Sequence, residues 1–428
     1  MLLMLTMLVA CKHRTAGTGI PELPTDSAPP DTTTPPNSPR GDILLTRTLV
    51  GSGLGSALAV TGDLDGDGHD NLLVGALEAG QVWLLAIDAT DLASAPVLSA
   101  PGAGGSLAST GDLDGDGYGD VLIGGAGSAW RAHGPLSGNI TLTDGWHSEA
   151  EDTDRVTVAA AGDLTGDGRP DLLLAAPRSD LGAEDAGAIW LLDGRAEPGD
   201  AAEQAFATIL GTIAHGFAGY ALDGAGDTNG DGVTDLVVGA WGADGFRGHG
   251  YLLHGPLTGS SSLADADQQW TGDEGWDVAG WSVSGAGDVD GDGRDEVILG
   301  AYGVDGAAWS VGAAYLVSDG QSIHDADAIL LGSVGDDRAG WSVDGVGDLD
   351  EDGHADLLIG GPGLDLGATD AGGAWLVYGP ISGIVSLDDA DARLFSDVPA
   401  AAAGSAVAGG RGRLLIGAPE ADTLYLLP

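Results

Sequence analysis

Short apolar runs recur along the chain, each after a polar turn and each ending on small residues. They read "NLLVGA", "DVLIGG", "DLLLAAP", "DLVVGA", "EVILGA" and "DLLIGG". A run of about four apolar residues between turn signals predicts a strand buried on both faces, because a strand with one face in water would alternate apolar and polar positions. The chain is therefore predicted to be all-β.

Two further strand patterns accompany each apolar run. Ahead of it lies a stretch of small residues, as in "AGYALDGAG" and "AGWSVSGAG", and after it comes a stretch with one aromatic residue, as in "QVWLLA" and "AIWLLDG". Each unit is therefore predicted to contain at least three strands, with room for a fourth.

An acidic nonapeptide of constant pattern precedes the apolar run in six units. The copies are "DLDGDGHDN" from Asp63, "DLDGDGYGD" from Asp112, "DLTGDGRPD" from Asp163, "DTNGDGVTD" from Asp227, "DVDGDGRDE" from Asp288 and "DLDEDGHAD" from Asp348. The C-terminal stretch "AGSAVAGGRGRLLIGAPEADTLYLLP" repeats the strands without the acidic loop. Seven units of roughly 50 to 60 residues predict a seven-bladed β-propeller. The strand "DILLTRTLVGS", residues 42–52, has no unit of its own and is predicted to complete the last one, which closes the ring and removes exposed sheet edges.

The order of these elements resembles the FG-GAP repeat of the integrin α-subunit propeller over nearly all of residues 42–428. The "GAP" element is literal in Gly417-Ala418-Pro419, whereas most units carry Ala-Gly or Gly-Ser in place of Phe-Gly. The resemblance implies a role in adhesion or recognition.

The acidic loops have the ligand pattern of a calcium site. In such a loop the side chains at positions 1, 3, 5 and 9 and the carbonyl at position 7 converge on one cation, and Gly at position 6 allows the turn. Converging carboxylates repel by ~4 kcal/mol per pair at an effective dielectric constant of 20, and a divalent cation reverses that sign. We therefore expect about six Ca²⁺ ions, with these candidate ligands: Asp63, Asp65, Asp67, His69 and Asn71; Asp112, Asp114, Asp116, Tyr118 and Asp120; Asp163, Thr165, Asp167, Arg169 and Asp171; Asp227, Asn229, Asp231, Val233 and Asp235; Asp288, Asp290, Asp292, Arg294 and Glu296; Asp348, Asp350, Asp352, His354 and Asp356.

Other metals and another calcium fold fit less well. A flexible loop with a carbonyl ligand suits Ca²⁺ better than Mg²⁺, and no His or Cys recurs among the side-chain ligands, which argues against zinc and copper. An EF-hand needs Glu at position 12 and flanking helices. Position 12 is instead apolar in all six loops: Val74, Ile123, Leu174, Val238, Leu299 and Ile359. Because Thr165, Asn229 and Asn71 replace aspartate, affinities are predicted to differ between blades.

The net negative charge of the chain indicates which kinds of partner it can bind. The 428 residues carry 65 acidic and 15 basic groups, for a formal net charge of −50, yet 43% are hydrophobic, which indicates a folded body. Such a body repels nucleic acid and anionic lipid and attracts cations. The single cysteine, Cys11, leaves no intramolecular disulfide and no cysteine-based zinc cluster.

The N-terminal region is predicted to lie outside the propeller. Leu8-Val9-Ala10-Cys11 resembles the lipobox of bacterial lipoprotein signal peptides, so residues 1–11 are interpreted as a signal peptide with lipid attachment at Cys11. The segment is short and lacks the usual Lys or Arg at its start, and the alternative is a free thiol in an ordinary leader. Residues 12–41, rich in Pro, Thr and Ser, are predicted to be a disordered linker before the propeller of residues 42–428. This organisation predicts a bacterial cell-envelope lipoprotein, at the outer membrane or surface, or a secreted protein.

An integrin-ligand tripeptide, Arg40-Gly41-Asp42, ends the linker, but such short motifs recur by chance.

No catalytic motif recurs, and neither H-E-x-x-H nor G-x-S-x-G is present. The sequence favours a non-enzymatic, calcium-binding module, monomeric and held to the membrane only by its lipid, that presents a loop face to a protein or glycan and not to nucleic acid. Trp281, Trp341 and Tyr220 share one repeat position and are predicted to pack between blades. Other tryptophans are either exposed anchors or core residues: Trp146, Trp241, Trp270, Trp276 and Trp309. The alternatives are a glycan-acting enzyme at the propeller axis, with Glu274, Asp277, Asp336 and Asp337 as candidate acids, or a structural envelope protein without a specific ligand.

Overall fold

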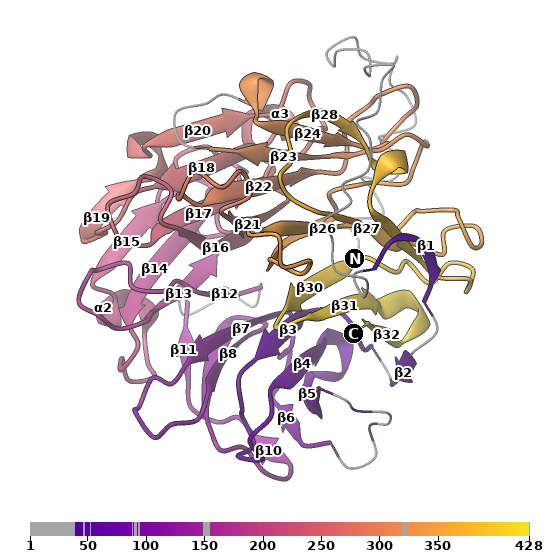
Figure 1. The fold of residues 1–428 in the computed structure, drawn as a ribbon. Helices are drawn as coiled ribbons and strands as arrows, with labels where there is room; N and C mark the ends of the chain where they lie inside the picture. The colour runs from indigo at the N-terminus through magenta and orange to yellow at the C-terminus, as the bar shows by residue number, and fades with distance from the viewer. Residues whose placement is uncertain are drawn as a thin grey trace.

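A ring of seven sheets forms the body of the protein. The computed structural model describes residues 39–45, 48–51, 53–87, 89, 92, 95–148, 155–318 and 323–427. Within these residues each sheet is one blade, and the innermost strands of the blades surround the centre of the ring in Figure 1. The predicted seven-bladed propeller is therefore confirmed.

Blades are numbered here in chain order, and each has four antiparallel strands from the axis outward. Blade 1 contains β3 (Leu58–Thr61), β4 (Asn71–Ala76), β5 (Gln81–Ala86) and β6 (Val97–Ser99). Blade 2 contains β7 (Ser106–Gly111), β8 (Asp120–Gly124), β9 (Ser128–His133) and β11 (Gly145–His147). Blade 3 contains β12 (Thr157–Ala160), β13 (Asp171–Ala176), β14 (Ala188–Asp193) and β15 (Ala207–Leu210). Blade 4 contains β16 (Ala221–Gly226), β17 (Asp235–Ala240), β18 (His249–Leu253) and β20 (Gln268–Thr271).

The remaining blades follow the same order. Blade 5 contains β21 (Ser282–Gly287), β22 (Glu296–Ala301), β23 (Ala313–Val317) and β24 (Ala328–Leu331). Blade 6 contains β25 (Ser342–Gly347), β26 (Asp356–Gly361), β27 (Gly373–Val377) and β29 (Ala392–Phe395). Blade 7 contains β30 (Ala406–Gly410), β31 (Arg413–Ala418), β32 (Thr423–Leu427) and, outermost, β2 (Thr48–Val50).

Helical segments in the described residues are single turns on the connections. They are α2 (Ala201–Gln204), α3 (Ala243–Phe246), η2 (Leu77–Ala79), η3 (Leu263–Asp265), η4 (Ile323–Asp325), η5 (Leu387–Asp389) and η6 (Pro419–Ala421). None of the helices in the described part of the chain has the length and apolar character needed to cross a membrane.

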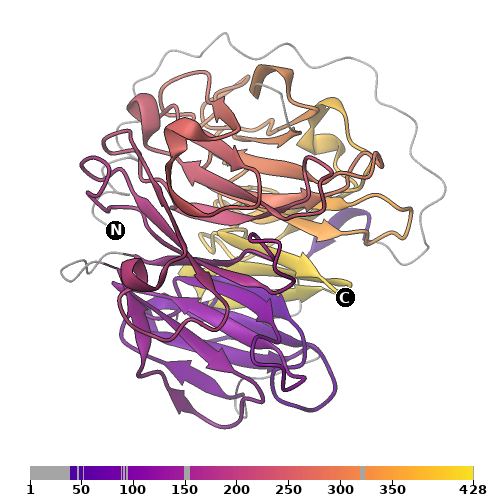
Figure 2. The same ribbon diagram turned by 90° about the vertical axis from the view of Figure 1, so that its left-hand side faces the viewer.

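The N-terminal segment closes the ring with two strands, not the one that the sequence predicts. As expected, β2 completes blade 7 by pairing antiparallel with β32, with Leu49 opposite Leu424. The preceding strand, β1 (Gly41–Leu44), instead pairs parallel with β29 at the outer edge of blade 6. In Figures 1 and 2 the yellow strands of blade 7 consequently lie between blade 6 and the indigo blade 1.

In several blades, a short strand from the next blade's connection pairs with the outer edge. Blades 2, 4 and 6 each send part of the connection before their outermost strand to the preceding blade, as β10 (Ile140–Thr141), β19 (Gly259–Ser262) and β28 (Gly383–Ser386). These strands pair parallel with β6, β15 and β24. Strands β1 and β2 stand in the same relation to blades 6 and 7, so the seam of the ring lies inside that connection of blade 7.

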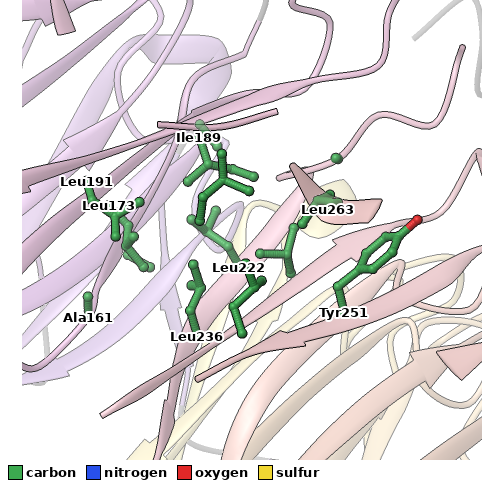
Figure 3. Close-up of a cluster of buried hydrophobic side chains, with 14 of the residues drawn as sticks. Ala161, Leu173, Ile189, Leu191, Leu222, Leu236, Tyr251 and Leu263 are labelled. Atoms are coloured by element: carbon green, nitrogen blue, oxygen red, sulfur yellow. The ribbon is translucent and has the colours of Figure 1, made fainter. Parts of the chain in front are cut away.

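Apolar clusters fill the interfaces between blades. Strand β13 serves two of them, because Leu173 and Ala175 pack toward blade 4 while Leu172 and Leu174 pack toward blade 2. Figure 3 shows the blade 3–4 cluster, in which Leu173, Ile189 and Leu191 meet Leu222, Leu236, Tyr251 and Leu263. Burial of alternate side chains in two different interfaces explains why the second strand of each blade is apolar after its first residue.

Candidate metal centres and the opposite end of the ring

Six acidic loops lie where the first strand of a blade turns into the second, in blades 1 to 6. We call this end of the ring the loop end. The position-12 residues fall inside the second strands, as in Leu299 of β22, so the flanking elements are strands and the loops are not EF-hands.

Backbone donors fold each loop around its first aspartate. In blade 2, Oδ1 of Asp112 accepts the Gly115 N–H at 2.7 Å, and Oδ2 accepts the Gly117 N–H at 2.8 Å. Gly117, at position 6, has φ of 94°, and the other five position-6 glycines have φ between 86° and 95°. Because L side chains rarely adopt this conformation, glycine is required there.

The ninth residue anchors the loop to its strand. Asp120 Oδ2 accepts the Leu113 N–H at 2.8 Å, and Glu296 Oε2 accepts the Val289 N–H at 2.8 Å, in each case from loop position 2. Asn71 makes the same bond to Leu64 at 2.7 Å, so its amide reproduces the structural role of the acid. Burial, and beyond it the neighbouring loop carboxylates, raise the pKa of Glu296 to about 7.

Side-chain oxygens converge in four of these loops. Four loops bring three carboxylates together with oxygens within 4.8 Å of one another: Asp63, Asp65 and Asp67; Asp112, Asp114 and Asp116; Asp288, Asp290 and Glu296; Asp348, Asp350 and Asp356. In the last group Asp350 is only 2% exposed, and its Oδ1 atom is buried without a hydrogen-bond partner. An orphaned carboxylate oxygen among two other acids fits a hard divalent cation with oxygen ligands.

Blades 3 and 4 carry neutral oxygens at position 3. The Thr165 hydroxyl donates to Asp163 Oδ1 at 3.2 Å, and Asn229 Oδ1 accepts the Asp231 N–H at 2.9 Å. Asn229 thus makes the bond that the position-3 aspartate makes in other loops, whereas Thr165 bonds to the first aspartate of its loop instead.

One imidazole beside the loops was missed by the sequence reasoning. His133, at the end of β9, places Nδ1 3.1 Å from Asp120 Oδ1 and 3.5 Å from Asp114 Oδ2. It lies outside the repeated nonapeptide, but the string HGPL, which begins at His133 and again at His254, marks it as a recurring position.

Blade 7 has a short turn with an arginine in place of the acidic loop. Its first two strands are joined by a tight turn at Arg411, whose guanidinium lies 2.7 Å from Asp70 Oδ1 in the loop of blade 1. The prediction that the seventh unit lacks the acidic loop is confirmed.

Aromatic side chains gather at the other end of blades 3 to 6. We call this set the aromatic end: Phe217, Tyr220, Trp241, Phe246, Trp276, Trp281, Tyr302 and Trp341. Trp281 precedes β21 and Tyr302 follows β22, whereas the acidic loop joins these strands at their opposite ends. Ring centroids of Phe246 and Trp276 are 4.3 Å apart in a stacked pair, and those of Tyr302 and Trp341 are 4.5 Å apart.

The five tryptophans predicted to be either anchors or core residues divide between buried and partly exposed positions. Trp146, Trp241 and Trp270 are buried and pack as core. Trp276 and Trp309 are partly exposed. Of the three residues predicted to pack between blades, Trp281 is buried, while Tyr220 and Trp341 remain partly exposed at the aromatic end.

The four candidate catalytic acids do not line the axis. Asp277 and Asp337 lie at equivalent places in the loops that precede β21 and β25, one blade apart. Asp336 directly precedes Asp337, and Glu274 donates its N–H to Asp277 Oδ2 at 2.7 Å. Burial, together with three acidic neighbours, raises the pKa of Asp337 to about 7. The acidic side chains on the central channel are instead Asp223 and Asp344.

Both charged residues of the Arg40-Gly41-Asp42 tripeptide contact blade 6. Arg40 Nη1 lies 2.6 Å from Asp391 Oδ1, with its guanidinium over the Tyr378 ring, and Asp42 Oδ1 lies 2.6 Å from Arg393 Nε. These two ion pairs thus hold β1 against blade 6. Cys11, the predicted signal peptide and the linker up to residue 38 lie outside the described residues.

Comparison with known proteins points to one repeat family. FG-GAP repeats match residues 156–192 and 339–377, in blades 3 and 6. Integrin alpha-PS2 of Drosophila melanogaster is 34% identical over 160 residues, which is 34% of this chain and 11% of the integrin. Integrin alpha-5 of Xenopus laevis is 31% identical over 155 residues, 34% of this chain and 14% of the integrin. The chain therefore spans only a small part of the length of these relatives.

The fold itself has a solved counterpart. A chain in the crystal structure of BBS1N in complex with ARL6DN, soaked with lead, superposes with a TM-score of 0.53 and 11% identity, covering 90% of this chain and 97% of that one. At this identity the likeness concerns the fold alone.

Proposed function

Since the chain is a seven-bladed propeller with FG-GAP repeats, similar to that of integrin α subunits, we propose that it is a non-enzymatic module that recognises a protein or a glycan. The observation that carries this proposal is the aromatic end. Aromatic side chains that combine a large apolar surface with partial exposure are the usual anchors of recognition surfaces.

Backbone conformation at the aromatic end supports the same assignment. Trp276 has φ of 79° and Phe246 has φ of 68°, both in the left-handed region that bulky residues avoid. Such strain persists only where the surrounding structure holds it, and it clusters at binding and catalytic sites. Exposed aliphatic side chains lie on the surrounding loops, with Val334 51% and Val398 43% exposed.

Binding to a printed array of glycans and peptides tests the proposal. Trp276→Ala and Trp341→Ala should each weaken binding at least tenfold, because a buried aromatic anchor contributes ~2 kcal/mol or more. Trp83→Ala is the matched control, since Trp83 of β5 is also partly exposed but belongs to blade 1, outside the aromatic end. Equal binding by all three variants and the wild type would exclude the aromatic end, and turnover of labelled polysaccharide would favour the enzyme alternative.

Calcium is proposed as the structural cation of the loop end. The converging oxygens, the unpartnered Asp350 Oδ1 and the glycine-dependent turns support this assignment. When bound, Ca²⁺ would neutralise the clustered carboxylates and fix the bend between the first two strands, while the loop residues would supply side-chain oxygens and one carbonyl. Metal analysis after equilibrium dialysis against Ca²⁺ should find about six ions per chain, and none bound would contradict the assignment.

Attachment to a bacterial envelope through lipidated Cys11, with residues 12–41 as a spacer, remains part of the proposal. Mass spectrometry of the N-terminus from native membranes should find a diacylated cysteine, and an unmodified Met1 would exclude the anchor.

A further inference from the structure

One register position of the innermost strands distinguishes three blades from the other four. The third residue of β16, β21 and β25 is Asp223, Ser284 or Asp344. The equivalent residues of blades 1, 2, 3 and 7, each opposite the third residue of the second strand, are Ala59, Ala108, Ala159 and Ala408. These residues line the central channel, which has a volume of about 330 Å³ and is otherwise lined mainly by Leu, Val and Ala.

The three polar residues form a hydrogen-bonded chain across consecutive blades. Ser284 Oγ lies 3.1 Å from Asp223 Oδ2 and 3.4 Å from Asp344 Oδ1. The chain continues into blade 7, where the Gly409 N–H donates to Asp344 Oδ2 at 2.7 Å. Blades 4, 5, 6 and 7 are therefore linked on the channel side.

The three hydrogen-bonded side chains have fewer hydrogens than they have facing acceptor oxygens. The Ser284 hydroxyl has one hydrogen, yet Asp223, Asp344 and the Gly285 carbonyl, at 3.0 Å, all face it with acceptor oxygens. If both carboxylates were ionised, two negative charges would face each other across the serine with one donor between them. One additional proton resolves the mismatch.

The backbone donors decide which acid holds that proton. Asp223 accepts the Gly224 N–H on Oδ1 at 3.0 Å and the Gly285 N–H on Oδ2 at 3.4 Å, so both of its oxygens already act as acceptors. Asp344 accepts the Gly409 N–H on Oδ2, which leaves Oδ1 facing only the serine. A hydrogen on Asp344 Oδ1 therefore gives each of the two carboxyl groups a hydrogen bond with the serine hydroxyl.

We propose that Asp344 is protonated in the folded protein and donates to Ser284, which donates to Asp223, so that one shared proton links blades 4 to 7. The titratable groups among the channel-lining residues are these two aspartates, because β3, β7, β12, β21 and β30 present aliphatic side chains, hydroxyls or backbone to them. Burial, and then the charge of Asp223, raise the pKa of Asp344 to about 7, whereas burial raises that of Asp223 to about 6. This set of hydrogen-bonded side chains is separate from the recognition and calcium sites of the proposed function.

The sign of the pH dependence follows from this assignment. Between the ordinary value of 3.8 and about 7, folded Asp344 holds a proton that the unfolded chain has lost. The stability that this proton confers is therefore lost as the pH rises through that range, and the unfolding equilibrium constant increases by up to about tenfold per pH unit from this group alone.

Denaturant unfolding at pH 5, 6 and 7 in saturating Ca²⁺ tests the proposal with a matched pair of isosteres. Asp344→Asn supplies a permanent amide donor to Ser284. The rise of up to about tenfold per pH unit that Asp344 contributes to the unfolding constant of the wild type should therefore be absent from this variant. Asp223→Asn turns one carboxylate oxygen into an amide donor, which then faces the N–H of either Gly224 or Gly285, so it should lose stability at every pH. It removes the contribution of Asp223 to the slope but should keep part of the slope that belongs to Asp344.

Asp344→Ala secures the test should the asparagine variant fail to fold, because alanine occupies this register in four other blades. It should also flatten the slope. Equal slopes in the wild type and the Asp344 variants would overturn the proposal, and so would a slope removed by Asp223→Asn alone.

Discussion

Glycine and alanine close the apolar strands because neighbouring blades touch there. A methyl group on Gly300 of β22 would overlap the Gly340 carbonyl oxygen at the entry to blade 6 and the Ser282 hydroxyl. The same close approach recurs at Gly239, against the Gly280 carbonyl, and at Gly75, against the Gly104 carbonyl. The small residues of the "GA" and "GG" strand ends are thus set by backbone contact between blades.

Gly300→Ala is accordingly expected to destabilise the protein by roughly 2–3 kcal/mol, since the contacting oxygen belongs to backbone that cannot rotate away. Urea unfolding measures the change. In blade 3 the equivalent residue is Ala175, so Ala175→Gly serves as the control and should cost about 1 kcal/mol or less. A Gly300→Ala midpoint equal to that of the wild type would refute the contact.

Strands β1 and β2 illustrate how neighbouring elements of one chain segment differ in energetic role. Leu49 of β2 is 3% exposed and packs in the cluster between blades 7 and 1, whereas Leu44 of β1 is 40% exposed. The ion pair between Asp42 and Arg393 is largely exposed and adds about 1 kcal/mol at most. Closure of the ring therefore draws on apolar burial by Leu49 of β2, and also on Ile43 of β1 and the following Leu45, which pack in the cluster between blades 6 and 7.

Substitution of one leucine in each of the two N-terminal strands tests the role of burial. Leu49→Ala should cost roughly 2–4 kcal/mol because it leaves a cavity between the last blade and the first. Leu44→Ala, with the same chemical change five residues earlier, should cost less than roughly 0.5 kcal/mol. Chemical denaturation of both variants gives the comparison, and similar losses would show that the buried Leu49 and the exposed Leu44 contribute alike.

Across the whole ring, the loop end concentrates acidic side chains of a protein with a formal net charge of −50. Cations that bind the folded loops and not the unfolded chain stabilise the fold by ~2.7 kcal/mol per site at a hundred times the dissociation constant. Their removal leaves repulsion that added salt screens only in part.

Scanning calorimetry in excess Ca²⁺ and in excess chelator should therefore show a melting temperature lower by several degrees without the ion. Asp116→Ala should reproduce only part of the loss, because each loop belongs to one blade and blades interact mainly with their neighbours. A melting curve indifferent to the chelator would contradict structural calcium.

The sequence by itself determined the number of blades, the three strand types in each and the place of the acidic loops, because these depend on local patterns that repeat along the chain. It also predicted that the seventh unit lacks the loop and that the N-terminal segment closes the ring. Only the tertiary structure decided that β1 joins blade 6, that alternate blades lend strands, and that the aromatic side chains gather at one end. The physical reason is the same in each case: these contacts join residues of different blades, and a repeat defines equivalent positions without showing which of them meet. Asp223, Ser284 and Asp344 occupy one register position, visible in "ALDGAG", "SVSGAG" and "SVDGVG", but only closure of the ring brings them within hydrogen-bond distance.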